Sequence, residues 1–275
     1  MTAARTPNPH RFRRALSRVH VWHWLWIVVA GLVFLVPIYS VIQFSLSGTV
    51  KGQPILHWYY TVFDDPNFLS SFWLSLQISL ETVAISLVLL VPTVFWIHLR
   101  LPRLRPVMEV ISVLPFVVPP IALIVGLSVF LRQFPWLIVR PEVLSLIYVV
   151  FALPFVYRSL DAGLQAIDLK TLTEAASSLG ASTFRTLLTV ILPNLRAAII
   201  GGSLLTVAIA MGEFTISSLL GFNTFSVYIY NIGTSTAYEG VALSFISFII
   251  TWGAMLSLFL LGRGGRSSAQ VAIAK

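Results

Sequence analysis

The segment Asp168–Pro193, DLKTLTEAASSLGASTFRTLLTVILP, is polar and amphipathic, whereas most of the chain around it is strongly apolar. Thr171 and Glu174 have the three-residue spacing of a capping box, which predicts a helix that begins there. Gly180 then supplies a C-cap where the chain turns. A membrane chain has little reason to place polar, well-capped helices between spans unless another protein docks on them.

A second short helix is predicted after the turn. Either Ser182 or Thr183 can cap it, and Pro193 ends it or kinks it into the next span. Its apolar positions are Phe184, Leu187, Leu188 and Ile191. In the first helix the apolar side holds Ala175, Ala176 and Leu179.

The spacing within this segment resembles a family signature. Glu174-Ala175-Ala176 is followed by Gly180 and then by Val190 with Leu192-Pro193. This pattern is similar to the EAA loop of permease subunits of binding-protein-dependent ABC importers, which has EAA, three residues, G, nine residues and I-x-LP. Val190 in place of Ile is the only departure, and it is conservative.

The resemblance implies that the hairpin is a coupling helix held in a groove of an ATP-hydrolysing subunit. The residues expected to make this contact are Glu174, Ala175, Ala176, Leu179, Gly180 and Arg185. The alternative is a re-entry helix that merely lies on the cytoplasmic membrane surface.

Composition requires a bilayer around this chain. Of its 275 residues 57% are hydrophobic and 10% charged, with a mean hydropathy of +0.89, more apolar surface than a soluble domain can bury. Cysteine is absent, which excludes disulfides and thiol chemistry. Six spans are predicted, at 24–46, 71–97, 108–131, 143–165, 197–219 and 239–262. We therefore expect an all-α membrane protein, a type I importer permease bundle with a cytoplasmic coupling helix.

The charge distribution predicts the orientation. The net charge is +8 and the pI about 10.2. With the N-terminus inside, all but three of the 18 Lys and Arg residues lie in cytoplasmic segments, the exceptions being Lys51, Arg132 and Arg140. By the positive-inside rule both termini and the hairpin are cytoplasmic. The basic surplus is therefore a topology signal and a lipid-facing collar, not a nucleic-acid site.

Three regions are expected along the chain. Residues 1–20 are a basic cytoplasmic segment, disordered or on the membrane surface; 21–262 are the permease domain, with the EAA loop at 168–193; and 263–275 are a cytoplasmic tail. The first apolar run is too long for a cleavable signal peptide. In the outer loop, Trp58-Tyr59-Tyr60 predicts an interfacial aromatic belt or a contact with a binding protein.

Prolines mark the third span. Pro115, Pro119 and Pro120 remove backbone donors, which lipid does not tolerate unless protein or a wet cavity satisfies the freed carbonyls. This predicts a kinked helix that lines the translocation pathway, as similar spans do in the family. The alternative is a distortion that serves packing alone.

Two carboxylates fall inside predicted spans. Burying a charge there costs roughly 2.5–3.5 kcal/mol, so Glu81 and Glu213 should face a cavity or a partner. Glu213-Phe214 belongs to MGEFTISSLLG, which resembles a Gly-Glu-Phe element of polyamine, sulfate, molybdate and iron permeases. Glu213 could be part of a gate or could serve packing, whereas a structural role is favoured for Glu81. Both residues and Phe214 are assigned to the pathway or its gate.

Catalytic and metal-binding constellations are missing from the sequence. The five His residues are scattered without ligand spacing, and no GxxxxGK[ST] motif is present. We expect no catalytic residue, no metal and no cofactor on this chain, with ATP and Mg²⁺ bound by partner subunits. A membrane enzyme is thereby excluded. A secondary transporter that relays protons through Glu81 and Glu213 is disfavoured, because such a carrier needs no cytoplasmic helix pair.

The resemblance also implies partners and a substrate. They are two ATPase subunits, a second homologous permease, and a periplasmic or lipid-anchored binding protein, assembled in a bacterial inner membrane. The third span, the EAA loop and the GEF element are most similar to the smaller permease of spermidine/putrescine importers, which predicts a polyamine. Iron, thiamine and aminophosphonate remain alternative substrates.

Overall fold

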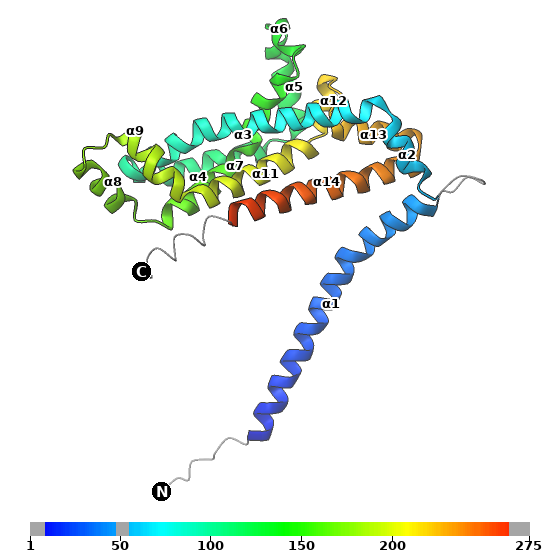
Figure 1. Ribbon diagram of the computed structural model, residues 1–275, viewed down its shortest axis with the longest axis horizontal. Helices are drawn as coiled ribbons and strands as arrows, with labels where there is room; N and C mark the ends of the chain where they lie inside the picture. Colours follow the sequence, from blue (N-terminus) through cyan, green and yellow to red (C-terminus); the bar gives the residue numbers. More distant parts are fainter. Residues whose placement is uncertain (1–8, 48–54, 264–275) are drawn as a thin grey trace.

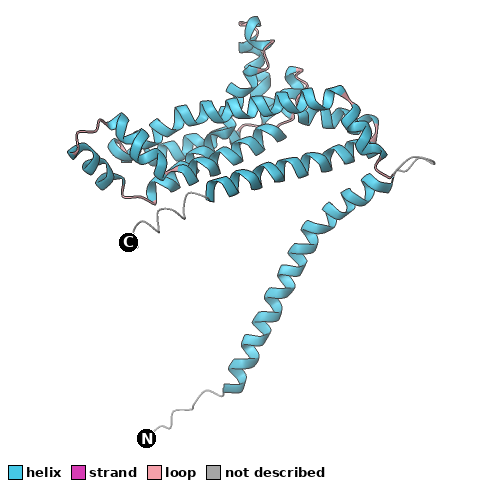
Figure 2. Ribbon diagram, viewed as in Figure 1, coloured by secondary structure: helices cyan, strands magenta, loops and turns pink. Residues whose placement is uncertain are grey.

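The computed structural model describes residues 9–47 and 55–263, and this part of the chain is made of helices and loops without a strand (Figure 2). The long helices are α1 (Pro9–Ser47), α3 (Pro66–Arg100), α7 (Glu142–Gln165), α11 (Arg196–Gly212) and α14 (Ala237–Arg263). Shorter elements between them are α2 (His57–Asp64), the 3₁₀ turn η1 (Pro102–Leu104), α4 (Arg105–Val117), α5 (Pro120–Leu131), α6 (Pro135–Ile138), α8 (Leu169–Ser178), α9 (Thr183–Thr186), the π-helical turn η2 (Leu187–Ile191), α10 (Leu192–Asn194), α12 (Thr215–Leu220) and α13 (Phe225–Ser235). The expected all-α fold is confirmed.

Membrane-spanning character is distributed over straight and broken helices. Three straight stretches are long and apolar enough to cross a bilayer, namely Trp22–Ser47, Pro66–Arg100 and Glu142–Gln165. Two further candidates are helix pairs, bent by 92° between Val117 and Pro120 and by 76° between Asn194 and Arg196. Within α14 the described apolar stretch, Ala237–Gly253, is shorter than these candidate spans.

Helices α3, α7 and α11 form the centre of the bundle, with α4 packed along α7 (Figure 1). Helices α7 and α11 approach closely because small residues face each other. A Cβ added to Gly163 would lie 2.7 Å from Ala198 Cβ, and the Ser159 hydroxyl donates a hydrogen bond to the Ala198 carbonyl at 2.6 Å. Close approach through small residues is a common way for helices to associate where lipid surrounds them.

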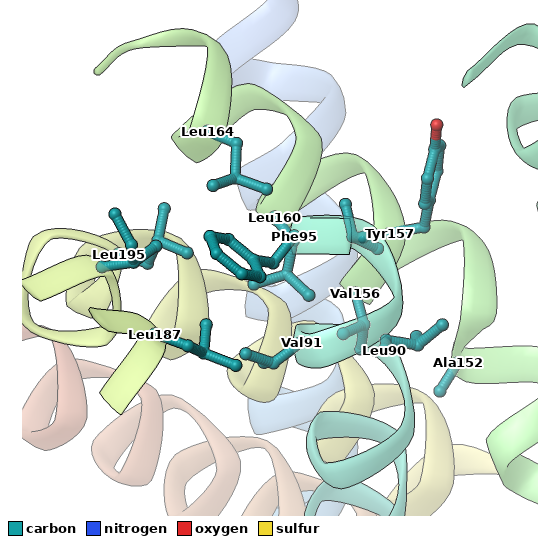
Figure 3. Close-up of a cluster of buried hydrophobic side chains, with 12 residues drawn as sticks. Leu90, Val91, Phe95, Ala152, Val156, Tyr157, Leu160, Leu164, Leu187 and Leu195 are labelled. Carbon is teal, nitrogen blue, oxygen red and sulfur yellow. The ribbon is translucent and has the colours of Figure 1, made fainter. Parts of the chain in front are cut away.

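One core cluster joins the central helices to the segment behind the hairpin. Figure 3 shows Phe95 of α3, Leu160 and Leu164 of α7, and Leu187 and Leu195 pointing toward one another. Full burial of a leucine side chain typically contributes about 1.5–3 kcal/mol to the free energy of folding. The base of the hairpin is therefore fixed to the bundle by packing.

The predicted third span is broken rather than kinked. Val118 and Pro119 both have extended backbone, with ψ of 121° and 136°. Each precedes a proline, whose ring disfavours helical geometry in the residue before it, so two successive residues leave the helix. As a result α5 and α6 project from the bundle (Figure 1), and the span at 108–131, expected to be one kinked helix, is divided by a 92° break.

A helix that the sequence did not predict closes the far end of the bundle. Asp65 caps α3 through a hydrogen bond from the Asn67 backbone N–H at 2.8 Å, and it also accepts one from the Tyr228 hydroxyl of α13 at 2.8 Å. Helix α13 crosses α14 so closely that a Cβ on Gly240 would lie 2.3 Å from the Gly233 Cα. The segment 220–238 lies between two predicted spans and received no assignment from the sequence, and α2 lies within the predicted outer loop.

Helix α1 diverges from the bundle (Figure 1). Its C-terminal end contacts the bundle, where Phe44 stacks on Tyr238 with ring centroids 4.7 Å apart and the Ser45 and Tyr59 hydroxyls lie 2.8 Å apart. The helix begins at Pro9, so it includes residues 9–20 of the basic segment. Residues 1–8 and 264–275 lie outside the described residues.

Candidate functional site

The first arm of the hairpin is α8, and its start differs from the sequence prediction. The Asp168 carboxylate accepts hydrogen bonds from the Thr171 backbone N–H at 3.2 Å and from the Thr171 hydroxyl at 2.7 Å. Asp168 is therefore the N-cap, and the proposed Thr171–Glu174 capping box is wrong. The Glu174 carboxylate lies 3.9 Å from Lys170 Nζ, one turn away, and is mostly exposed. The Thr171 hydrogen bonds lower the pKa of Asp168.

The turn between the two arms is set by Gly180, whose φ is +82°. The Ala181 N–H donates to the Ala176 carbonyl at 3.0 Å, and the Gly180 N–H donates to the Ser177 carbonyl at 2.9 Å. This pair of bonds is a Schellman motif, which satisfies the last carbonyls of a helix and needs a left-handed residue at this position. The C-cap expected from the sequence is confirmed.

The second arm begins at Ser182 and continues through a π-helical turn. The Ser182 hydroxyl accepts a hydrogen bond from the Arg185 N–H at 3.3 Å, which makes Ser182 rather than Thr183 the cap. Pro193 cannot bond back to the preceding turn, and the Asn194 side chain donates instead to the Val190 carbonyl at 2.7 Å. The arm ends at Asn194 and turns by 76° into α11, as a proline in this position allows.

The two faces of the hairpin differ in burial. Ala176, Leu187 and Ile191 are buried against the bundle. Leu179 and Phe184 are 90% and 69% exposed, and Ala175, Gly180 and Arg185 are exposed beside them. Leu179, which the sequence places on the apolar side of this helix, is therefore exposed rather than packed against the rest of the chain. The exposed residues form a knob of apolar side chains with one cation, which can fill a complementary groove.

Behind α8 lies a polar cavity of about 770 Å³, at the ends of α3 and α7. Its lining brings together basic residues that are distant in sequence, including Arg100, Arg105 and Lys170. Next to it Asp161 lies 3.2 Å from an Arg105 guanidinium nitrogen and 3.0 Å from His98 Nε2. The His98 ring is nearly buried, and its Nδ1 lies 2.9 Å from the Val94 carbonyl. These contacts fix the end of α7 from which the hairpin departs.

Glu213 lies in a second break, between α11 and α12. Its carboxylate accepts hydrogen bonds from the Tyr148 hydroxyl at 2.9 Å, the Ile216 N–H at 2.9 Å and the Ser217 N–H at 3.3 Å. Its backbone is extended, with ψ of 121°, so α11 ends at Gly212. The predicted span at 197–219 is therefore interrupted at Glu213, and of the expected cavity or partner the structure gives the carboxylate partners within the chain.

The other residues predicted for the pathway do not gather at one place. Glu81 accepts a hydrogen bond from Gln77, one turn earlier on α3, at 2.9 Å. Phe214 packs against the Tyr230 ring, with centroids 4.8 Å apart. Pro115 is buried, while Pro119 and Pro120 are exposed at the end of α4. Their assignment to a pathway or gate stays a prediction. Among the described residues no group of three or more His, Asp or Glu could hold a metal ion.

Sequence reasoning missed Asp168, Asp161, His98 and Tyr148. Asp168 could have been found, since Asp is a common N-cap and stands three residues before Thr171. Helix α13 could also have been predicted from the sequence. After Thr224, the apolar residues have helical spacing: Phe225, Tyr228, Ile229 and Ile232. No local signal points to Tyr148 as the partner of Glu213, which is 65 residues away.

Comparisons with known proteins agree with this architecture. Residues 99–263 match the family described as "Binding-protein-dependent transport system inner membrane component". The chain is 30% identical over 217 residues to the spermidine/putrescine transport system permease protein PotB of Haemophilus influenzae, an alignment that covers 71% of this chain and 76% of that protein. It is 32% identical over 181 residues to PotB of Escherichia coli, covering 59% and 64%.

Two further comparisons are informative. A probable sulfate transport system permease protein cysT of Prototheca wickerhamii is 41% identical over 124 residues, covering 43% of this chain and 47% of that protein. Among solved structures, a chain of a bacterial ABC transporter involved in the import of the acidic polysaccharide alginate matches with a TM-score of 0.66 at 16% identity, covering 95% of this chain and 100% of that chain. At this identity the structural match establishes the fold.

Proposed function

Since the chain belongs to the family of inner membrane components of binding-protein-dependent transport systems and is a permease subunit of an ABC importer, we propose that it imports a polyamine of the spermidine/putrescine class. The chain resembles two polyamine permeases over more of its length than it resembles the sulfate permease. These relatives support the substrate class. Glu213 and Glu81 do not support the substrate class, because both carboxylates already accept hydrogen bonds from side chains of this chain.

The knob on the hairpin is the observation that carries the coupling role. It combines a rigid base, buried through Leu187 and Ile191, with an exposed tip at Leu179 and Phe184. We propose that this tip sits in a groove of an ATPase subunit, so that closure of two ATPases rocks the bundle. ATP and Mg²⁺ bind those subunits. Arg100, Arg105 and Lys170 beside the hairpin support a cytoplasmic position for this end.

A single hairpin engages one ATPase, whereas two ATPases must close on each other to hydrolyse ATP. The complex therefore contains a second permease, which we propose is a homologous chain rather than a second copy. The outer loops receive a periplasmic or lipid-anchored binding protein. A crystal structure of the alginate transporter was determined in complex with its pentasaccharide-bound periplasmic protein, and this supports such an arrangement.

The test is to purify the complex through a tag on this chain, identify its other subunits by mass spectrometry, and identify the small molecule on its binding protein. We expect two permeases, an ATPase and bound spermidine or putrescine. Recovery of sulfate, iron, thiamine or an aminophosphonate would replace the proposed substrate but keep the importer. An active complex with this chain as its only membrane-spanning subunit would refute the heterodimer.

A further inference from the structure

The break between α11 and α12 is built around one side chain. A helix that starts anew leaves its first N–H groups without partners, and in a membrane no water replaces them. Glu213 provides the acceptors: Oε1 binds the Ile216 N–H at 2.9 Å and Oε2 the Ser217 N–H at 3.3 Å. Its carboxylate thus caps α12 from the residue before the N-cap position, which Phe214 occupies without a capping side chain.

The same carboxylate reaches a distant helix. The Tyr148 side chain is 2% exposed, within the core cluster of α5 and α7, and its hydroxyl donates to Glu213 Oε2 at 2.9 Å. The backbone of Glu213 is held as well, since the Ser217 and Ser226 hydroxyls donate to its carbonyl at 3.2 and 2.5 Å. Three donors therefore occupy most of the roughly four lone-pair positions of the carboxylate, which leaves little capacity for a substrate cation.

Helix α7 connects this break to the hairpin. It forms one helix from Glu142 to Gln165, with Pro154 inside it, and Asp168 caps α8 three residues later. At a rise of 1.5 Å per residue, Tyr148 lies about 25 Å from the end of α7. The Asp161 contacts with His98 and Arg105 fix that end beside the cavity behind α8. A rigid-body movement of the hairpin therefore reaches Tyr148 through a single helix.

We propose that Glu213 is a positioning residue which caps α12 and, through the Tyr148 hydroxyl, ties the broken fifth span to α7, so that movement of the hairpin moves the break. The inference rests on the proposed coupling function but is independent of which substrate is carried. It assigns to Glu213 neither substrate binding nor proton transfer.

The test uses the full complex in proteoliposomes, with Tyr148→Phe, Glu213→Gln and the double variant. Tyr148→Phe removes one hydroxyl and keeps the buried ring. Tyr39→Phe, on an exposed position of α1, is the matched control. The readouts are ATP hydrolysis stimulated by the loaded binding protein, and uptake over a range of concentrations of labelled spermidine. Assembly is measured by co-purification.

We expect Tyr148→Phe to assemble normally, to lower maximal uptake about fivefold or more, to raise ATP hydrolysed per molecule transported, and to leave the half-saturating spermidine concentration unchanged. The double variant should be no worse than Glu213→Gln, because both changes alter the same Glu213–Tyr148 contact. A Tyr148→Phe complex that behaves like Tyr39→Phe would overturn the proposal, and so would a Glu213→Gln effect confined to the half-saturating concentration.

Failure of the substrate assignment gives a different result. If the wild-type complex takes up no spermidine, the proposed substrate is wrong, and stimulation of ATP hydrolysis by the binding protein carrying its native ligand still tests the tie. Weaker coupling in Tyr148→Phe would then support the proposal, and unchanged stimulation would refute it. If the Glu213→Gln complex fails to assemble, the result for Tyr148→Phe alone supports or refutes the proposal.

Discussion

The hairpin at 168–194 and the break at 213–226 are both turns between helices, but they are held in opposite ways. The hairpin depends on partners within five residues: Asp168 with Thr171, Ala181 with Ala176, and Ser182 with Arg185. The break has local hydrogen bonds from Ile216 and Ser217 to Glu213 as well, but it also depends on partners 65 and 150 residues away, Tyr148 with Glu213 and Ser75 with the Phe225 N–H. Near water a turn can be specified by local sequence, whereas inside the bundle its shape requires the assembled fold.

Removing the Glu213 side chain should give the largest loss of stability. Glu213→Ala leaves two backbone N–H groups and the Tyr148 hydroxyl without an acceptor. At about 1–3 kcal/mol for each unsatisfied buried donor, the loss is about 3 kcal/mol or more. The measurement is the Tm of the purified complex. Glu81→Ala is the control, because the hydrogen bond that Glu81 makes among the described residues is with Gln77 on its own helix. Equal Tm losses would contradict a special role for the break.

Ser75→Ala should give the second-largest loss of stability, about 1–3 kcal/mol in the free energy of unfolding. It removes the acceptor of the Phe225 N–H, at 2.7 Å in the buried contact between α3 and α13. The exposed Ser70, which bonds to the Asn67 carbonyl of its own helix, provides the control Ser70→Ala. Amide hydrogen exchange should rise in α13 and not in α8. Faster exchange in the hairpin would show that the two regions are not independent.

Gly180→Val should reduce the stability of the hairpin by about 1–2 kcal/mol and leave the rest of the bundle unchanged. Only the positive φ opposes the change, because nothing lies within 4 Å of an added Cβ. We expect normal membrane levels but transport uncoupled from ATP hydrolysis. Gly180→Asn is the matched variant, since Asn tolerates left-handed geometry, and it should retain more than half of the uptake. Wild-type uptake by Gly180→Val at equal expression would count against the coupling role.

Acidification should produce the smallest effect, at Asp168. Its folded pKa lies below the ordinary value of about 3.9, because the Thr171 hydroxyl and N–H bind the ionised form. A lowered pKa means that the cap stabilises α8 fully above pH 4 and less as pH falls through the folded pKa. Exchange of the Thr171 amide, corrected for its intrinsic rate, should therefore increase at low pH in the wild type. Asp168→Asn, which caps without titrating, should show no such increase.

The contrast between the two turns explains what the sequence could predict. Gly180, the second-arm cap and α7 followed from spacing and hydropathy, because each depends on neighbours along the chain. The break at Glu213 did not, because GEF lies in a continuous apolar run and its partner Tyr148 belongs to another helix. Three prolines indicated a distortion of the third span, but hydropathy cannot distinguish a kink from a 92° break. Helix α13 was overlooked because its 11 residues are too short to cross a bilayer.

Helix α1 also bears on how the subunit is made. None of the residues in its most apolar stretch is buried against the rest of the chain. During synthesis this helix reaches the bilayer before α3 or α7 exists, and it can stay there without a partner because lipid satisfies its side chains. Helix α3, with Ser79, Thr82 and Ser86 buried on its inner side, cannot be accommodated as easily alone. The first helix can therefore anchor the nascent chain while the later helices find one another.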